Sequence, residues 1–558
     1  GQCLFETQNK KAFSYASEEE IERALFPETQ IEQTSIDTSE EVAVEDTPVV
    51  FESGKGDFYI FDAEKNTFVL FEENITAKIN RTDEYEFRLS LVSGKGKIHT
   101  QLLDPNAQQH FDRNTLSYVW CWARNGAVWT LSIKFASVSS LLAMSNKIGE
   151  LLYEMKNKDE KMNKDDEKYL LDAFVEQMEI EEEAESTTES EEEEEESEDE
   201  AAQDEETDSE KNKNLLVGYK DNKLFVTRGN TLGVFGSEKS GKVKFQGGTQ
   251  LRTKDKIVVP EKMMLHNQDT SLVMTSKDSP HSLYRMDLER EKIVDEWKVD
   301  DYRKIENIVP ETKYAQMTPS QTFIGLGSSS VFRIDPRVSG NKRVEESTKQ
   351  YSTPVGFTCG ATTGKGEVVL GTKKGDLRLY NKIGIKAKTN LPGFGDPAIG
   401  VDATENGKYI VATYKTYLLV IDTEVPGEEG SGYTKRMGET KPTPRRLQLL
   451  PEHASFLDAD ASFTPARFNT GSSEEKAIIT SIGPFVVTWN FRRVKNGHLG
   501  GYQIRKYDDN VVADNFKYGQ DRQIAVALPD HLTVTGKQNL YAPSQRTFTT
   551  RKPAPKRK

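Results

Sequence analysis

The sequence predicts a mainly β protein of two folded parts joined by an acidic stretch, and three observations carry this prediction. Alternating β-branched and aromatic runs fill the stretch from Val49 to Met155 and end in a run with helical spacing. A run of almost only Glu, Asp, Ser and Thr follows, from Glu176 to Glu210, and beyond Asn214 a short hairpin unit recurs. A chain of 558 residues is long enough for two hydrophobic cores.

The first folded part, residues 46–158, is predicted as a pleckstrin-homology-like domain. Glycine, asparagine and aspartate separate its strand-like runs, which are "DFYIFD", "NTFVLFE", "YEFRLSLVS", "KIHTQLLD", "LSYVWCWAR" and "AVWTLSIKF". The next run places apolar residues at helical spacing, namely Leu141, Met144, Ile148, Leu151, Leu152 and Met155. A meander of about seven strands closed by one C-terminal amphipathic helix is the plan of such a domain.

Two groups of side chains in this part are candidate ligand sites. Trp120, Trp122 and Trp129 could form a ligand platform, but their alternation along the strands favours core positions. Lys55, Lys95 and Lys97 are expected in loops and are too dispersed to predict a phosphoinositide pocket.

The second folded part, residues 214–545, contains seven hairpin units. They end near residues 235, 287, 335, 381, 422, 490 and 534, and read "LFVTRGNTLGVFG", "LVMTSKDSPHSLYRMD", "TFIGLGSSSVFRID", "VVLGTKKGDLRLYN", "YIVATYKTYLLVID", "AIITSIGPFVVTWN" and "QIAVALPDHLTVTG". Most of the gaps lie near the roughly 40 to 45 residues of a four-stranded propeller blade. The one long gap holds the insertion "EVPGEEGSGYTKRMGETKPTP".

A closed ring of blades would bury the faces of these units and protect their edges. The sequence therefore predicts a seven-bladed β-propeller, with a closing strand from near "VFESGK" or from "RTFTTR". The usual Trp-Asp blade ending survives only as "MD", "ID", "YN" and "WN", so the propeller is a divergent WD40-like one.

Three polar segments flank or join the folded parts. Residues 1–45 are expected to be a mobile N-terminal segment with one short helix, Ser17 to Phe26, because Ser17 and Glu20 form a capping box. Residues 159–213 are predicted as an acidic linker, and residues 546–558 as a basic tail that includes "RKPAPKRK". That tail fits a nuclear address, a contact to acidic partners, or a solubilising end.

Charge and cysteine content exclude several classes of protein. The net charge is −16, and without the acidic run the rest is close to neutral, so no basic face for nucleic acid is indicated. Cys3, Cys121 and Cys359 lack the spacing of a disulfide framework or a zinc site. No apolar run has the length of a membrane span, and a soluble, intracellular protein is expected.

The segment "VFRIDPRVSG" raises the question whether Asp335 and Arg337 perform chemistry. Aspartate and proline are typical of a tight turn after a strand, and we expect this turn to lead into the next blade. Asp or Asn recurs at the equivalent place in four other hairpins, as Asp287, Asn381, Asp422 and Asn490. One active site is not built five times, so the position is predicted to be structural.

Longer motifs carry a family resemblance. "LYRMDLEREKIVDEWKV", "VFRIDPRVSG" and the stretch from Gly375 to Thr423 resemble the C-terminal propeller of the vacuolar import and degradation protein twenty-seven family, whose plant members are called defective embryo and meristems. The resemblance covers Asn214 to about Gly536, and the order of domains also fits. It implies a protein with no assigned catalytic activity and a link to the delivery of proteins for vacuolar degradation.

No catalytic, cofactor-binding or metal-binding residues are predicted. The chain has seven histidines, and those in the second part, His266, His281, His498 and His531, lack metal-ligand spacing. There is no Gly-x-Ser-x-Gly, and "GSEKSGK" fails the phosphate-loop pattern in register.

The best candidate for a protein-binding rim is "KTNLPGFGDPAIG". Its glycines and prolines make a rigid connection that can present Lys386, Lys388 and Asp396, together with Asp335 and Arg337 of the "IDPR" turn. An ordinary blade-to-blade connection with demanding turn geometry explains this stretch equally well.

Two modifications are also expected from sequence, each with a simpler alternative. Ser190 and Ser197 precede acidic residues and suit acid-directed phosphorylation, although a solvated spacer explains the run as well. Gly1 suits N-myristoylation and Cys3 palmitoylation, a pair of chains that would anchor stably. Phe5 stands where the myristoylation pattern has Ser or Thr, and trimming of methionine or a tag remnant would also leave Gly1 first.

These observations favour a non-enzymatic adaptor or scaffold that docks other proteins on its propeller. The alternative is a membrane-linked trafficking factor that uses lipid recognition or N-terminal acylation, and an enzyme with an unrecognised site comes third. The expected location is cytoplasmic, with membrane association as a further expectation. The sequence names neither the partner nor the oligomeric state.

Overall fold

The computed structural model describes residues 47–174, 202–203 and 210–544, apart from residues 64, 125–126, 159, 221, 239–240, 440, 459, 472–473 and 520–521. These residues fall into two compact units. The first holds the residues up to 174 together with residues 449–458, and the second holds the others. Gly1, Cys3, Ser190, Ser197, the helix expected at Ser17 to Phe26 and the basic tail lie outside the described residues.

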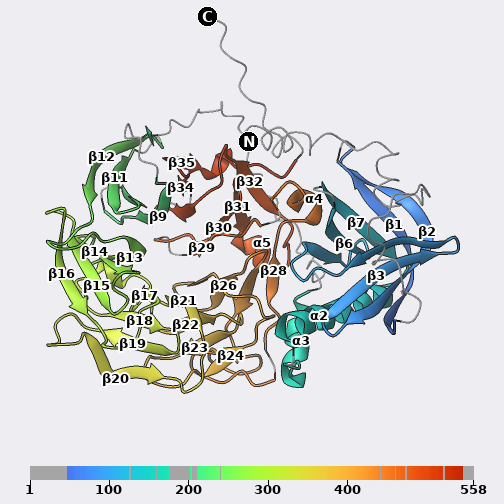
Figure 1. Cartoon of the computed structure of the whole chain (residues 1–558), viewed down its shortest axis with the longest axis horizontal. Helices are drawn as coiled ribbons and strands as arrows, with labels where there is room; N and C mark the ends of the chain where they lie inside the picture. The colour runs from blue at the N-terminus through green and yellow to red at the C-terminus, as the bar shows by residue number, and fades with distance from the viewer. Residues whose placement is uncertain are drawn as a thin grey trace, which may run out of the picture. The chain divides into compact units, whose positions relative to one another are not determined.

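The first unit is an antiparallel seven-stranded sheet of pleckstrin-homology-like plan, as predicted (Figure 1). The order of its strands is β4-β3-β2-β1-β7-β6-β5. They are β1 (Val49–Asp62), β2 (Thr67–Asp83), β3 (Glu86–Ser93), β4 (Gly96–Leu102), β5 (Gln109–Asp112), β6 (Ser117–Arg124) and β7 (Ala127–Phe135). The helix α2 (Val138–Asn157) follows, and Ser137 caps it by accepting the N–H of Ser140 at 3.2 Å.

The core of this unit lies between the sheet and one face of α2. Leu141, Met144 and Ile148 of the helix are fully buried against the inward side chains of the strands. Trp120 is part of this core, and Trp122 and Trp129 pack against it, which confirms the interpretation of the tryptophans as core residues. The expectation that the three lysines lie in loops is wrong for two of them, because Lys55 belongs to β1 and Lys97 to β4. Lys95 pairs with Glu72 at 2.9 Å.

A second helix, α3 (Lys164–Asp172), lies inside the stretch predicted as linker. Asn163 caps it, and three of its residues, Tyr169, Leu170 and Leu171, are buried. The helix packs on α2, so the buried apolar surface of this unit extends further along the chain than the acidic composition indicates.

The second unit is a seven-bladed β-propeller built from seven four-stranded sheets (Figure 1). The first three blades are β9 (Asn212–Val217), β10 (Lys223–Arg228), β11 (Thr231–Ser237), β12 (Val243–Gln250); β13 (Pro260–His266), β14 (Ser271–Ser276), β15 (Ser282–Asp287), β16 (Lys292–Lys298); and β17 (Asn307–Pro310), β18 (Phe323–Gly327), β19 (Ser330–Ile334), β20 (Arg343–Gln350).

The next three blades are β21 (Phe357–Thr362), β22 (Val368–Thr372), β23 (Leu377–Tyr380), β24 (Thr389–Leu391); β25 (Gly400–Ala403), β26 (Tyr409–Thr413), β27 (Leu418–Asp422), β28 (Arg445–Leu447); and β29 (Arg467–Phe468), β30 (Ala477–Ile482), β31 (Phe485–Asn490), β32 (Tyr502–Lys506). The seventh blade is β33 (Ala513–Phe516), β34 (Gln523–Ala527), β35 (His531–Gly536) and β8 (Ala202–Gln203). Three short helices lie in the connections of the propeller: η1 (Ala315–Met317), α5 (Phe491–Lys495) and η2 (Lys537–Asn539).

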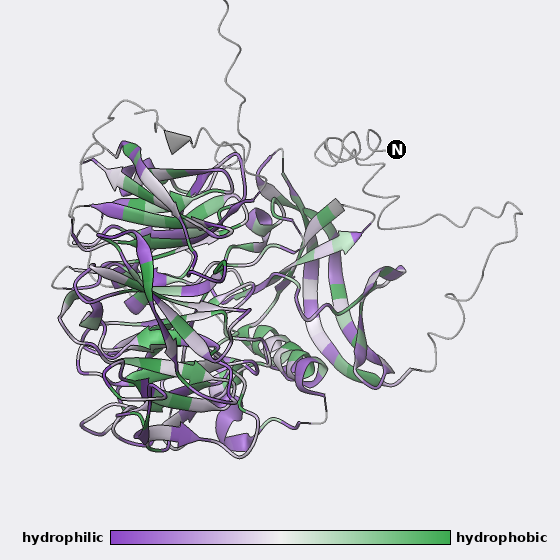
Figure 2. Cartoon of the chain, turned by 60° about the vertical axis from the view of Figure 1, so that its left-hand side comes forward, coloured by the Kyte–Doolittle hydropathy of each residue, from purple (hydrophilic) through white to green (hydrophobic). Residues whose placement is uncertain are grey.

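The ring is closed through its first strands. Each of β9, β13, β17, β21, β25, β29 and β33 contacts the first strand of the next blade, and β33 contacts β9. All seven predicted hairpins are the second and third strands of a blade. These strands are almost entirely buried, which is why their apolar pattern is the clearest in the chain (Figure 2).

The closing strand differs from both expectations. The outermost strand of the seventh blade is β8, which pairs antiparallel with β35 and comes from the chain before the first blade. "VFESGK" instead lies within β1 of the first unit, and "RTFTTR" lies outside the described residues. The acidic composition around Ala202 hides a strand this short. Among the described residues, no helix has the length and apolar character needed to cross a membrane.

Candidate protein-binding surface

Asp335 and Arg337 lie in the turn between β19 and β20, the third and fourth strands of the third blade. The expectation that this turn leads into the next blade is therefore wrong. The Arg337 guanidinium donates two hydrogen bonds of 2.9 Å to the Asp335 carboxylate, which also accepts the Arg337 N–H at 3.0 Å. These hydrogen bonds from Arg337 lower the pKa of Asp335. The pair is satisfied within its own turn.

The same turn geometry recurs at the ends of other third strands. Asp287 accepts the N–H groups two and three residues on, Asp422 accepts the N–H of Glu424, and Asn490 accepts the N–H of Arg493. Asn381 takes the same place after β23. Asp287 and Asp422 hold turns in this way, as their recurrence in the sequence indicates, and Asn490 caps the short helix α5.

The remaining predicted rim residues are not gathered at one place. Lys386 and Lys388 are exposed in the connection that precedes β24, whereas Asp396 follows that strand and is half-buried. Asp396 accepts a hydrogen bond of 2.9 Å from the Tyr417 hydroxyl. The Lys388 N–H donates to the Leu379 carbonyl at 2.8 Å, and the exposed side chains of the two lysines remain predicted contact groups.

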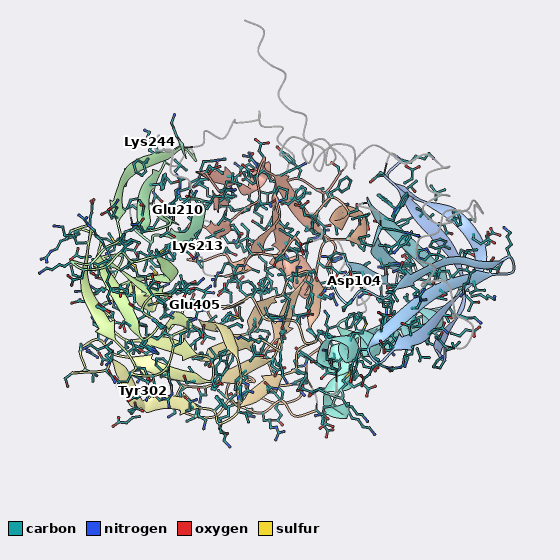
Figure 3. All side chains as sticks on the ribbon, in the orientation of Figure 1. Asp104, Glu210, Lys213, Lys244, Tyr302 and Glu405 are labelled. Atoms are coloured by element: carbon teal, nitrogen blue, oxygen red, sulfur yellow. The ribbon has the colours of Figure 1, made fainter. Side chains whose placement is uncertain are left out.

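Sequence reasoning missed Tyr302, whose side chain is 90% exposed. It lies in the connection between β16 and β17, from the second blade to the third, and Figure 3 marks it on the outer side of the ring. Its neighbours in sequence are two acids and two bases, "DDYRK". An aromatic residue within so charged a connection is the one signal that could have identified it, because a core position would not have such neighbours.

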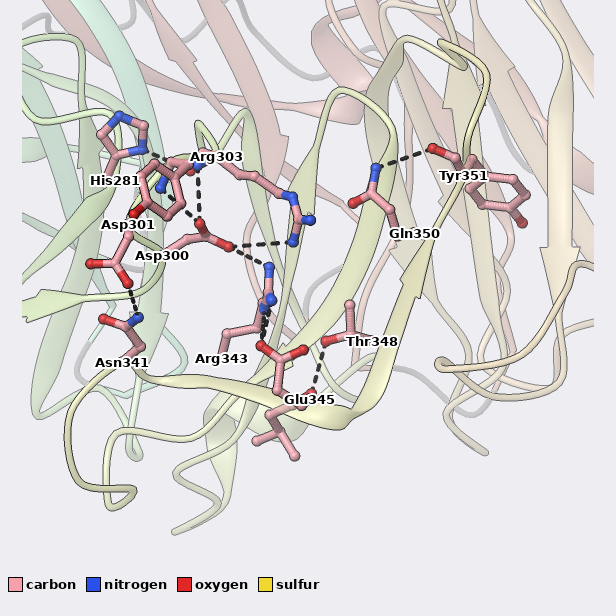
Figure 4. A network of polar contacts seen from close by, with 12 residues as sticks. His281, Asp300, Asp301, Arg303, Asn341, Arg343, Glu345, Thr348, Gln350 and Tyr351 are labelled. Carbon is pink, nitrogen blue, oxygen red and sulfur yellow. Dashed lines mark hydrogen bonds and ion pairs between the residues drawn. The ribbon is translucent and has the colours of Figure 1, made fainter.

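The backbone on both sides of Tyr302 is held by a buried carboxylate (Figure 4). Asp300 Oδ1 accepts the N–H of Tyr302 at 2.9 Å and that of Arg303 at 3.0 Å. Its other oxygen pairs with the Arg343 guanidinium of β20, which also binds Glu345. Burial would raise the pKa of Asp300, but these N–H groups and the guanidinium together hold it below the usual value.

Further hydrogen bonds tie this connection to its neighbours. Asn341 Nδ2 donates to Asp301 at 2.7 Å, and the Lys342 N–H donates to the Lys298 carbonyl at 2.9 Å. The His281 ring bonds the Arg303 carbonyl at 2.9 Å. The turn that carries Asp335 and the connection that carries Tyr302 are therefore one bonded assembly, with the tyrosine side chain projecting from it.

Most of the exposed large apolar side chains of the propeller belong to its first three blades. In the described part of the propeller they number eight, and six belong to the first three blades: Phe245, Ile257, Val259, Val294, Tyr302 and Val338. The other two are Ile399 and Tyr541. Aromatic residues ringed by charged groups are typical of the energetic centre of protein interfaces.

Tyrosines from the turns between first and second strands meet across the mouth of the central channel. Tyr219 of the first blade and Tyr314 of the third both pack edge-on against Tyr518 of the seventh, with ring centroids 4.8 and 6.2 Å apart. The Tyr314 hydroxyl also accepts the Gly471 N–H of the sixth blade at 3.4 Å. Burial raises the pKa of Tyr219 and of Tyr314. Blades on opposite sides of the ring thus bond across this mouth.

A buried ion pair also spans the ring. Lys313 Nζ donates to Asp402 Oδ1 at 3.0 Å and to the Ala403 carbonyl, while Asp402 Oδ2 accepts the Phe468 N–H at 2.9 Å. Both charged groups have their partners, so the arrangement joins the third, fifth and sixth blades. Among the described residues, no group of three or more His, Cys, Asp or Glu is placed to hold a metal ion.

The insertion between β27 and β28 is ordered rather than a free loop. It buries Tyr433 and Met437, and two of its charged side chains form ion pairs: Lys435 pairs with Glu428 at 3.2 Å, and Glu424 pairs with Lys408 of the blade at 3.0 Å. These internal pairs leave it a weaker candidate than Tyr302.

Fold and surface together define a class: a WD40-like β-propeller combined with a pleckstrin-homology-like domain, both of which are generally protein-interaction modules. The sequence matches the family model described as the VID27 C-terminal WD40-like domain over residues 210–553, and the VID27 PH-like domain over residues 49–155. The chain therefore belongs to the VID27 family, which confirms the resemblance noted from its motifs.

Two relatives carry the name vacuolar import and degradation protein 27. That of Schizosaccharomyces pombe is 39% identical over 88% of this chain and 67% of its own length. That of Saccharomyces cerevisiae is 28% identical over 97% of this chain and 78% of its own length. A solved β-propeller domain, of Myceliophteria thermophila Cps50 (Swd1), aligns over 60% of this chain and 98% of that domain with a TM-score of 0.42 and 11% identity.

Proposed function

We propose that this protein is a non-enzymatic adaptor that docks a partner protein on the connection between β16 and β17 of its propeller, with Tyr302 as the anchor. The observation that carries the proposal is a tyrosine that is 90% exposed on a connection whose backbone is fixed by Asp300. Leaving a large aromatic ring in water has no benefit for folding, whereas a pre-ordered backbone lowers the entropy cost of binding. The flanking charges would then set the orientation of the partner.

The names of the two relatives support a place in the delivery of proteins for vacuolar degradation. In that setting the pleckstrin-homology-like domain is a second recognition module, and the acidic stretch between the two modules allows each to hold its own partner at high effective concentration. The proposed location is the cytoplasm, with membrane association through the N-terminal segment as part of the proposal.

The polar groups of the channel mouth support an adaptor over an enzyme. An enzyme of this fold would need titratable groups free to meet a substrate, but Lys313 and Asp402 are paired with each other. Tyr219 and Tyr314 are engaged across the channel.

The test compares partner recovery by three full-length variants in cells of the source organism. Tyr302→Ala should lose at least one partner that the unchanged chain recovers, by about tenfold or more, the effect expected of an aromatic hot spot. Tyr541→Ala is the matched control, since this tyrosine is also exposed, at 52%, elsewhere on the propeller. Lys386→Glu with Lys388→Glu tests the predicted rim separately. Equal recovery by Tyr302→Ala and Tyr541→Ala would refute the proposed docking surface.

A further inference from the structure

The outer face of β6 and β7 in the first unit is covered by a segment that is distant in sequence. This segment, Leu449–Asp458, lies between β28 and β29 along the chain, yet it belongs to the first compact unit. Its single helical turn, α4 (Pro451–Ala454), contacts β6. We call it the 449–458 segment.

Strand alternation defines which side chains of β6 and β7 form this outer face. Tyr118 and Trp120 point inward with Leu131 and Ile133, so their neighbours point outward. The outward residues include Val119, Thr130 and Ser132, which are only 7%, 4% and 4% exposed. Lys134, the next outward residue of β7, is exposed. Something therefore covers one patch of an otherwise solvent-facing side of the sheet.

The 449–458 segment contacts this patch through a backbone carbonyl. Cys121 Sγ donates to the Pro451 carbonyl at 3.2 Å, and Thr130 Oγ1 donates to the same oxygen at 3.4 Å. Cys121 and Thr130 are directly opposite each other in the β6–β7 pairing. Two side chains from adjacent strands thus converge on one acceptor of the segment.

Other side chains of the segment are also buried. Leu449, Pro451 and Ala454 are buried. Burial raises the pKa of Glu452, whose charged neighbours are His110 and Asp112 of β5, and burial lowers the pKa of His453 to about 4. The segment is therefore largely removed from water where it meets β6 and β7.

The segment has the character of a bound peptide rather than of a secondary-structure element of the sheet. A four-residue helical turn is far too short to be stable alone, and no side chain caps it. Pro451 at its first position restricts the backbone to the bound form, which lowers the entropy lost on docking. The turn is therefore ordered by the surface on which it lies.

We propose that the outer face of β6 and β7 is a peptide-binding site whose occupant is the chain's own 449–458 segment, and that this segment docks and leaves as a unit. While docked, the segment closes the face to partners, and its release opens a site for a proline-led helical turn of the same chemistry. This proposal is independent of the docking surface around Tyr302.

Cys121 provides a direct reporter of the docked state in the full-length chain. Its thiol is the donor to Pro451, so docking should protect it from alkylation, and mass spectrometry can follow it beside Cys359, which is buried in the propeller. We expect Ala454→Arg, which places a charge at a buried position, to raise the alkylation rate of Cys121 by about tenfold or more, a shift of one decade in the docking equilibrium. Asp458→Arg, at an exposed position of the same segment, should leave the rate unchanged.

A synthetic peptide of residues 447–458 completes the test. Added to the Ala454→Arg chain at up to about 1 mM, on the order of the effective concentration of a short flexible tether, it should restore the protection of Cys121. Unchanged alkylation in Ala454→Arg, or no protection by the peptide, would overturn the proposal. If Cys359 also becomes reactive in that variant, a chain with residues 449–458 replaced by Gly and Ser at equal length supplies the same comparison.

Discussion

Lys313 is a single side chain that links separate blades of this propeller. Its ammonium group, contributed by the third blade, is buried against Asp402 of the fifth, and the second oxygen of Asp402 bonds the sixth. Both side chains are almost fully buried, at 6% and 10% exposure, so neither charge can be left to water. The residues that end most third strands, by contrast, are exposed or half-buried and act only within their own turns.

We expect Lys313→Met to destabilise the propeller by about 3 to 5 kcal/mol, because it leaves a buried carboxylate without its counter-charge. The free energy of unfolding can be followed through the urea dependence of Cys359 alkylation, since this thiol is buried in the propeller. Lys415→Met is the control: its partner Asp460 is fully exposed, and we expect a change within about 0.5 kcal/mol. A Lys313→Met chain as stable as the Lys415→Met chain would contradict the structural role of the pair.

Among the strands of the propeller, those that are buried on both faces could be predicted from the sequence, and the exposed ones could not. The second and third strands of every blade were predicted because both faces of these strands are buried and their residues are almost uniformly apolar. The outer strand β20, "RVEESTKQ", lies at a sheet edge with polar side chains, and its sequence does not differ from that of a loop. The closing strand β8 and the turn α4 are ordered by surfaces contributed from elsewhere in the chain, which no local pattern encodes.

The candidate site was predictable only in part for the same reason. Asp335 was correctly interpreted as a turn residue from its recurrence, but the exposure of Tyr302 depends on how the connection from β16 to β17 is folded. Asp300 determines that fold through Arg343, which lies more than forty residues away along the chain. Contacts of this separation leave no local trace in sequence.

His99 makes the stability of the first unit depend on pH. Its ring lies in the core beside Phe58 and Trp122, with Nε2 at 2.8 Å from the Gln101 side-chain oxygen. Burial lowers its pKa from 6.5 to about 4. Between these two values the unfolded chain binds a proton that the folded domain does not, so stability is lost as the pH falls through this window.

We expect the first unit to lose up to about 3 kcal/mol between pH 6.5 and pH 4 from this one group. The effect is measured by the urea dependence of amide hydrogen exchange in β3, a core strand on the far side of the sheet order from β6 and β7, with the exchange pulse given at one fixed pH. His99→Gln should flatten the pH profile, whereas His281→Gln in the propeller should not alter it. A profile that is equally steep in His99→Gln would show that other groups dominate.

At the scale of the whole molecule, two folded units present two kinds of surface. In the propeller, tyrosines meet across the channel mouth, and a fixed backbone on the connection between β16 and β17 presents the exposed Tyr302. The pleckstrin-homology-like unit carries its own segment on an outer sheet face. We therefore propose that partners bind on the outer side of the blades and that the central channel does not bind them.

Site-specific photo-crosslinking of the full-length chain in cells tests directly whether a partner protein touches Tyr302. A photoreactive phenylalanine analogue placed at position 302 reports which molecules touch the anchor, and the same analogue at position 541 is the control at a second exposed tyrosine. We expect discrete covalent adducts to one or a few proteins from position 302 that are absent from position 541. Identical adducts from both positions, or none from position 302, would contradict it.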